Sequence, residues 1–99
     1  MENQLNIELT EDIADGVYSN LAVISHSSSE FVLDFIRVVP NVPKAKVKSR
    51  VMMTPDHAKR LLRALTDNIR RYEAQYGVIQ EHDGGHGNIP MNFTPTAQA

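Results

Sequence analysis

The amino-acid sequence predicts an α+β domain, in which a four-stranded antiparallel meander precedes one long C-terminal helix packed on one face of the sheet (ββββα). Three observations predict this class. Apolar residues alternate with polar ones in much of the first half of the chain, and turn-forming residues separate these stretches. After Thr54, apolar residues recur at helical spacing. The chain has 99 residues, the length of a single domain.

The first two predicted strands lie before the chain's only serine-rich stretch. Residues 5–9 alternate apolar and polar side chains, which predicts a short amphipathic strand. Residues 10–16 are acidic and typical of a turn that ends at a glycine. Residues 17–25 are rich in strand-forming side chains and predict the second strand.

The last two predicted strands follow. Residues 30–39 are again rich in strand formers, and the five residues 26–30 fit a hairpin connection to the preceding strand. The segment Pro40–Pro43 predicts a turn, because each proline removes a ladder donor. Residues 44–53 then show the clearest alternation of the chain, with cations at every second position from Lys44 to Arg50.

One long helix is predicted after these strands. Thr54 can cap it, Pro55 suits its first turn, Asp56 complements its dipole, and Gly77 is placed to end it. Residues 1–77 are therefore expected to form the domain and residues 78–99 a non-globular tail. The apolar stripe of the helix comprises Ala58, Leu61, Leu62, Leu65, Ile69, Tyr72 and Tyr76.

The two faces of the predicted sheet differ in character. The apolar face is expected to meet the helix and form the core; its residues are Val17, Leu21, Val23, Phe31, Leu33, Phe35, Val47 and Val51. The other face mixes apolar and charged side chains, which is typical of an interface. A short chain gains stability by oligomerising, so we expect a homodimer through this mixed face, with candidate residues Tyr18, Ala22, Ile24, Val32 and Ile36.

Charge is strongly segregated along the chain. Residues 37–71 hold all ten Lys and Arg side chains and only two acids, a net charge of +8. Residues 1–36 hold seven acids and residues 72–99 hold three, and neither segment has Lys or Arg. The overall charge of −2 therefore conceals a basic middle segment between two acidic ends. Such a pattern indicates an acidic partner.

Two sets of cations are candidates for binding that partner. On the fourth predicted strand, Lys44, Lys46, Lys48 and Arg50 share one face about 6.6 Å apart, similar to the spacing of phosphates on a nucleic-acid strand. The alternatives are an edge strand whose lysines block edge pairing, or pairing across the sheet with acids such as Asp34. On the helix, Lys59, Arg63 and Arg70 lie opposite the apolar stripe, where an ordinary solvated face is the alternative.

Several classes of protein are disfavoured. Without cysteine, disulfides and thiolate metal sites are excluded. His82 and His86 flank a carboxylate but no helix aligns them, so we expect no metal and no cofactor. His26 beside three serines is not a triad, whose members converge in space from separate segments. No Gly-rich phosphate loop is present. The acidic N-terminus and the short apolar runs indicate neither a signal peptide nor a membrane span, so a cytoplasmic location is expected.

Three stretches carry a family resemblance: Tyr18–Arg37 (YSNLAVISHSSSEFVLDFIR), Pro43–Arg50 (PKAKVKSR) and Thr54–Leu65 (TPDHAKRLLRAL). Together they resemble the domain-of-unknown-function family 3467 of Bacteroidetes-type bacteria. The resemblance implies a cytoplasmic bacterial protein and supplies no activity, cofactor or catalytic residue. The ββββα order is also similar to the repeat of the single-strand-binding Pur and Whirly-type folds, which work as intertwined dimers.

These observations lead to a functional expectation without enzymatic activity. We expect a small binding or adaptor protein that acts on nucleic acid or a nucleoprotein complex through its basic segment. The alternative is a protein-protein interaction module that docks an acidic protein surface. An enzyme with a composite site at the dimer interface is a third class. Neither a membrane nor a small-molecule substrate is expected as a partner.

Overall fold

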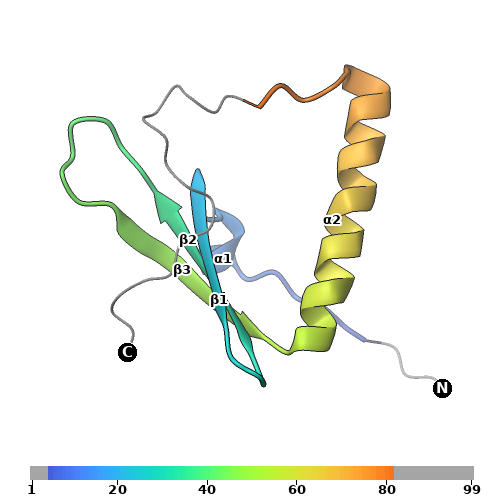
Figure 1. Cartoon of the computed structure of the whole chain (residues 1–99), viewed down its shortest axis with the longest axis horizontal. Coiled ribbons are helices and arrows are strands. Elements are labelled where there is room, and N and C mark those ends of the chain that lie inside the picture. The colour runs from blue at the N-terminus through green and yellow to red at the C-terminus, as the bar shows by residue number, and fades with distance from the viewer. Residues whose placement is uncertain (1–4, 82–99) are drawn as a thin grey trace.

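The computed structural model describes residues 5–81 and shows an α+β fold (Figure 1). The elements follow the order α1 (Glu11–Ala14), β1 (Leu21–His26), β2 (Phe31–Arg37), β3 (Lys46–Met53) and α2 (Pro55–Tyr76). The three strands form one antiparallel sheet in the order β1-β2-β3, so β2 is central and β1 and β3 are edges. The meander and the long helix are thus confirmed.

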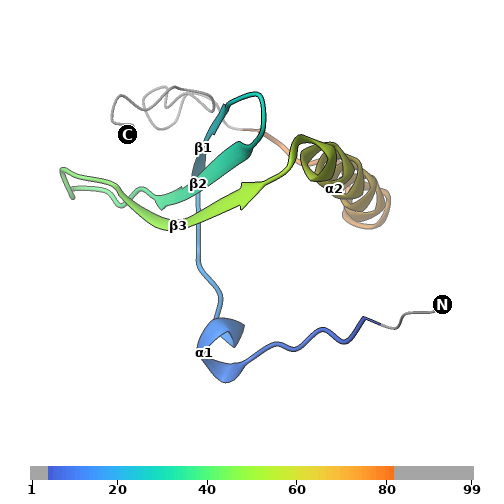
Figure 2. The same ribbon diagram turned by 90° about the horizontal axis from the view of Figure 1, so that it is seen from below.

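The first of the four predicted strands, at residues 5–9, is not found. This segment carries no strand, and Leu5, Ile7 and Leu9 are 82%, 85% and 70% exposed. Alternation alone does not make a strand, because an extended segment also needs a neighbouring strand for its hydrogen bonds. The short helix α1 and the positive φ of Gly16 (79°) instead lead this segment away from the sheet (Figure 2).

The β1–β2 hairpin has a four-residue loop where the sequence predicted five. His26 pairs with Phe31, and their rings stack with centroids 5.3 Å apart. Inside the loop, the Ser27 hydroxyl accepts hydrogen bonds from the backbone N–H groups of Ser29 and Glu30. A change of one residue in the loop shifts the pairing of β1 with β2 by one position. Each set of alternate β1 side chains then shares a face with the other set of β2 side chains.

The register therefore corrects the predicted faces. Side chains that pair across the sheet lie on the same face. One face, here called the Val23 face, comprises Leu21, Val23, Ser25, Val32, Asp34, Ile36, Val47, Arg50 and Met52. The opposite Phe35 face comprises Ala22, Ile24, His26, Phe31, Leu33, Phe35, Arg37, Lys46, Ser49, Val51 and Met53.

This register contradicts two predicted groupings of side chains. The predicted dimer face is wrong as a single surface, because Ala22 and Ile24 lie on the Phe35 face whereas Val32 and Ile36 lie on the Val23 face. The predicted core face likewise combined residues of both. Among the described residues, only Val23, Ile36 and Asp34 are buried, and all three lie on the Val23 face.

Helix α2 begins and ends where the sequence predicted. Thr54 is the N-cap, and its hydroxyl accepts a hydrogen bond of 3.2 Å from the backbone N–H of His57. Pro55 occupies the first turn, where its missing N–H costs nothing. Gly77 ends the helix at φ 100°, a conformation that residues with a Cβ rarely adopt. The expected tail from residue 82 onward lies outside the described residues.

The cap at Thr54 yields a first prediction. Thr54→Ala should lower the free energy of unfolding by about 0.5–2 kcal/mol, because it leaves an N–H of the first turn without its acceptor. Urea unfolding followed by circular dichroism measures this change. Thr10→Ala is the matched control, since Thr10 precedes α1 without forming a side-chain cap hydrogen bond. Equal losses in the two variants would contradict the assignment of the cap.

The predicted packing of the helix on its own sheet is wrong for a single copy of the chain. None of the residues of α2, all of which are described, is buried. Figures 1 and 2 show the helix beside the sheet. The cause is the short connection between the two elements. Thr54 alone separates the edge strand β3 from α2, so the chain has no loop in which the helix could turn back over the sheet. The radius of gyration is 16.3 Å, whereas a compact domain of this length has about 13 Å.

Candidate nucleic-acid interface

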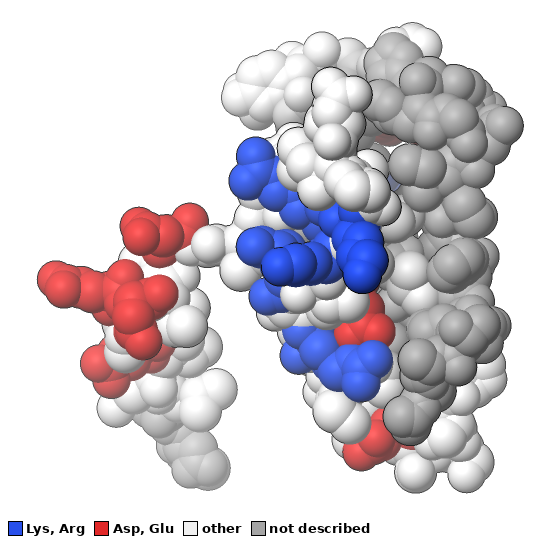
Figure 3. All heavy atoms as spheres, turned by 90° about the vertical axis from the view of Figure 1, so that its left-hand side faces the viewer, with Lys and Arg blue, Asp and Glu red and all other residues white. Residues whose placement is uncertain are grey.

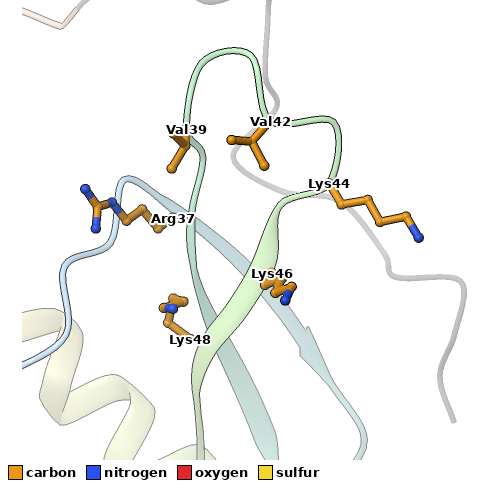
Figure 4. Close-up of a pocket in the computed structure, with 6 residues that line it drawn as sticks. All are labelled: Arg37, Val39, Val42, Lys44, Lys46 and Lys48. Carbon is orange, nitrogen blue, oxygen red and sulfur yellow. The ribbon is translucent and has the colours of Figure 1, made fainter.

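Four cations gather at the end of the sheet that carries the β2–β3 turn. They line a shallow hollow of about 190 Å³, together with two valines of the turn (Figure 4). We call this site the basic hollow; its residues are Arg37, Val39, Val42, Lys44, Lys46 and Lys48. The structure thus brings together three of the four cations predicted on the basic strand.

The β2–β3 turn gives the hollow its shape. The backbone N–H of Val42 donates to the carbonyl of Val39 at 3.2 Å and closes a β-turn. Pro40 and Asn41 occupy its central positions, and Asn41 has a φ of 67°. Proline followed by a residue with positive φ is typical of a type II turn, and asparagine tolerates that conformation better than most residues. The turn sets Val39 and Val42 beside each other above the cations (Figure 4).

An irregularity in β3 separates the predicted row of cations. Phe35 pairs with Ser49 and Ile36 pairs with Val47, so Lys48 is an extra residue in a β-bulge. Because the bulge interrupts the alternation, Lys46 shares the Phe35 face with Arg37, whereas Arg50 lies on the Val23 face. The prediction that all four cations project from one face is therefore wrong for Arg50.

Arg50 instead forms an ion pair with Asp34, the alternative that the sequence left open. The two residues pair directly across β2 and β3. Arg50 donates from Nε to Oδ1 at 2.6 Å and from Nη2 to Oδ2 at 2.8 Å. The hydrogen bonds from Arg50 lower the pKa of Asp34 below its ordinary 3.8, although burial opposes the shift. The carboxylate in turn raises the pKa of Arg50.

Arg37 is a member of the hollow that the sequence did not single out. Its guanidinium lies over the ring of Tyr18, 5.5 Å from the centroid. Next to it, the Asn20 side chain accepts from the Val38 N–H at 2.8 Å and donates to the Val38 carbonyl at 3.0 Å, which fixes the end of β2. Pairing the strands outward from the Pro40–Pro43 turn would have placed Arg37 opposite Lys46.

The helix cations lie apart from the basic hollow. Arg60 and Arg71 form exposed i,i+4 ion pairs with Asp56 and Asp67. The predicted binding residues Lys59, Arg63 and Arg70 are exposed on α2. Figures 1 and 2 show α2 and the β2–β3 turn at opposite ends of the molecule, so one copy does not merge the two sets.

Charge remains segregated in the folded chain. Figure 3, which looks onto the end of the sheet with the turn, shows Lys and Arg gathered on the body of the molecule. The segment that carries α1 holds Glu8, Glu11, Asp12 and Asp15, all exposed, and stands apart from these cations. No ion pair found within residues 5–81 includes a cation of the basic hollow.

The described residues contain neither a metal-binding cluster of His, Cys, Asp or Glu nor a membrane-spanning helix. Within the described part of the chain, no three His, Cys, Asp or Glu side chains come together to hold a metal ion. His82 and His86, considered above for such a site, lie outside the described residues. No helix between residues 5 and 81 has the length and apolar character needed to cross a membrane.

Comparison with known sequences bears out the family resemblance. The family described as "Protein of unknown function (DUF3467)" matches residues 1–81, which include the whole sheet, the basic hollow and α2. Neither the curated proteins nor the solved structures contain a match to the chain.

Proposed function

Because the chain belongs to family DUF3467, whose description names no activity, we propose its function from the geometry of the basic hollow: it is a small, cytoplasmic, non-enzymatic protein that binds the phosphate backbone of nucleic acid. The observation that carries this proposal is the gathering of Arg37, Lys44, Lys46 and Lys48 around one shallow hollow. Their segregation from the acids of the N-terminal segment supports it.

Electrostatics favours a polyanion at this site. Like charges held around one hollow repel one another, and an anion that neutralises them gains the corresponding interaction free energy. Three arginines outside the hollow form ion pairs within residues 5–81, as Arg50 does with Asp34. No ion pair within residues 5–81 includes a cation of the hollow, so an external anion can bind there without displacing an acidic side chain of this part of the chain.

The chemistry of the lining indicates which polyanion fits. Lys44 in the turn before β3 and Lys46 at the start of β3 provide point charges, and Arg37 provides a planar fork for a phosphate. Val39 and Val42 add an apolar surface that can contact a sugar or a base. Asn20, which could read a base edge, is already occupied by the backbone of Val38. We therefore expect backbone binding with little sequence preference.

Titration of the full chain with a labelled single-stranded oligonucleotide tests this function. Fluorescence anisotropy at salt concentrations between about 50 and 200 mM should show affinity falling as salt rises. Three or four phosphate contacts at about −0.7 each give a slope of about −2 to −3 in a plot of log affinity against log salt. Two oligonucleotides of equal length and different sequence should bind with similar affinity.

A second titration distinguishes binding of nucleic acid from binding of an acidic protein surface. Poly-glutamate of comparable length serves as a probe for an acidic protein surface. Preference for the oligonucleotide supports phosphate binding, whereas preference for poly-glutamate would favour a protein-protein interaction module. Absence of oligonucleotide binding at the lowest salt concentration would overturn the proposed function.

A further inference from the structure

The largest unexplained feature of the structure is the exposed apolar stripe of α2. Helix α2 spans 22 residues, and its stripe runs along the whole length of one side. Four members, Leu62, Leu65, Tyr72 and Tyr76, are 64%, 55%, 51% and 68% exposed. Leaving such side chains in water forfeits the burial that normally stabilises an amphipathic helix.

A matching surface lies on the Phe35 face of the sheet. None of its residues is buried, and Ile24 and Val51 are about two-fifths exposed, at 43% and 39%. This face also contains a second shallow hollow, of about 280 Å³, lined by Val17, Ser19, Phe35, Ser49 and Val51. It thus offers a largely apolar surface with a depression that can receive a side chain.

The helix of the same copy does not reach this face. Thr54 is the single residue between β3 and α2, and it is held in an extended conformation as the N-cap of the helix. Folding α2 back over the sheet would require a different backbone conformation at this single connecting residue. Short connections of this kind favour exchange of an element between copies.

We propose that the chain forms a homodimer by reciprocal helix exchange, in which α2 of each copy packs its apolar stripe on the Phe35 face of the other. Two copies related by a two-fold axis then cover the apolar stripe and the Phe35 face of both copies at once. This dimer differs from the one predicted by sequence, because the helix, rather than the mixed strand face, forms the contact.

The expected area agrees with a stable dimer. A helix of 22 residues is roughly 33 Å long and about 10 Å wide. Each helix-on-sheet contact covers roughly 330 Å² on each surface, and two reciprocal contacts bury about 1,300 Å² in total, within the range of about 1,200–2,000 Å² for stable interfaces. The large and aromatic side chains of the stripe suit the centre of such an interface.

Helix exchange also joins the two basic sets, a consequence that rests on the proposed function. Arg37 and Lys46 lie on the Phe35 face, next to the surface that the exchanged helix would cover. Lys59, Arg63 and Arg70 lie opposite the stripe, so they would point outward from the same side of the sheet. The dimer would then present one extended basic surface where a single copy presents two separate ones.

Mass measurement without nucleic acid tests the dimer independently of the proposed function. Light scattering at micromolar concentration should give about twice the chain mass of 11.1 kDa. Leu65→Glu, which places a charge in the middle of the stripe, should shift the species to a monomer, whereas Arg63→Glu on the opposite side of α2 should leave the dimer intact. A monomeric wild type would overturn helix exchange, whatever the result of the nucleic-acid titration.

A cross-linking experiment distinguishes helix exchange from other dimers. Its result does not depend on whether the Leu65→Glu variant folds. The chain has no cysteine, so Leu33→Cys on the Phe35 face and Leu65→Cys on the stripe can be introduced in one chain. Helix exchange predicts that oxidation links two chains through a disulfide between positions 33 and 65, identified by mass spectrometry of the digested dimer. A disulfide within one chain, or linked dimers without the 33–65 bond, would overturn the proposal.

Discussion

Reversing Lys46 and Lys48 to Glu should abolish measurable binding of the oligonucleotide. The double change takes the four cations of the basic hollow from a charge of +4 to zero and places two carboxylates where phosphates are expected. If each lost charge-assisted contact is worth about 1.5–3 kcal/mol, affinity falls by at least about 100-fold. Anisotropy titration at low salt measures the loss, and circular dichroism verifies that the fold is retained.

A charge-matched control keeps this result specific to the hollow. Arg60→Glu with Arg71→Glu changes the net charge equally, at two cations that already have acidic partners in Asp56 and Asp67. We expect this control to retain most of the affinity. Similar losses in both variants would show that only the net charge matters and would remove the hollow from consideration.

Neutral variants of the same lysines distinguish the loss of phosphate contacts from the repulsion between glutamate and phosphate. Lys46→Ala with Lys48→Ala should make the salt dependence less steep by about 0.7 for each lost phosphate contact on a single strand. The glutamate variant adds repulsion to this loss, so it should bind more weakly than the alanine variant. An unchanged slope in the alanine variant would contradict direct phosphate contacts by these two side chains.

Local sequence signals predicted the elements of the fold well. The helix start at Thr54–Pro55 and its end at Gly77 were correct because caps depend on a few adjacent residues. The turn at Pro40–Pro43 was correct for the same reason. In contrast, the strand predicted at residues 5–9 failed because a strand needs a partner, and alternation within one segment does not show whether a sheet edge is available.

The faces of the sheet were harder to predict than its strands. Two single-residue effects decided them: the four-residue loop after His26 and the bulge at Lys48. Each shifts the pairing by one residue, and with a period of two, one residue moves every later side chain to the other face. Three of the predicted strand cations were therefore found together, while Arg50 was found on the opposite face beside Asp34.

The ion pair between Asp34 and Arg50 should make the stability of the fold depend on acid. Asp34 lies on the central strand and is 3% exposed, so its charge relies on the two hydrogen bonds from Arg50. Asp34→Asn keeps the size of the side chain but removes the charge and one acceptor. Because Arg50 is more than half exposed and solvent weakens the pair, we expect the free energy of unfolding to fall by about 1–2 kcal/mol near neutral pH.

The direction of the pH dependence follows from the lowered pKa of Asp34. The unfolded chain titrates this carboxyl near its ordinary pKa of 3.8, and the folded chain titrates it at a lower pKa. Over the pH range between these two pKa values, the unfolded state binds more protons. The stabilisation is therefore complete above the ordinary pKa and is lost as pH falls through that value toward the folded-state pKa. Asp34→Asn lacks this contribution, so its stability should approach that of the wild type in acid.

Urea unfolding at a series of pH values from neutral to about 3 measures this convergence. Asp67→Asn is the matched control, since Asp67 forms a comparable pair with Arg71 on an exposed helix surface, where ion pairs contribute little. The control should follow the wild type at every pH, while the difference between wild type and Asp34→Asn narrows as acid is added. If that difference were constant with pH, the cost of Asp34→Asn would come from packing, and the charge on Asp34 would not stabilise the sheet.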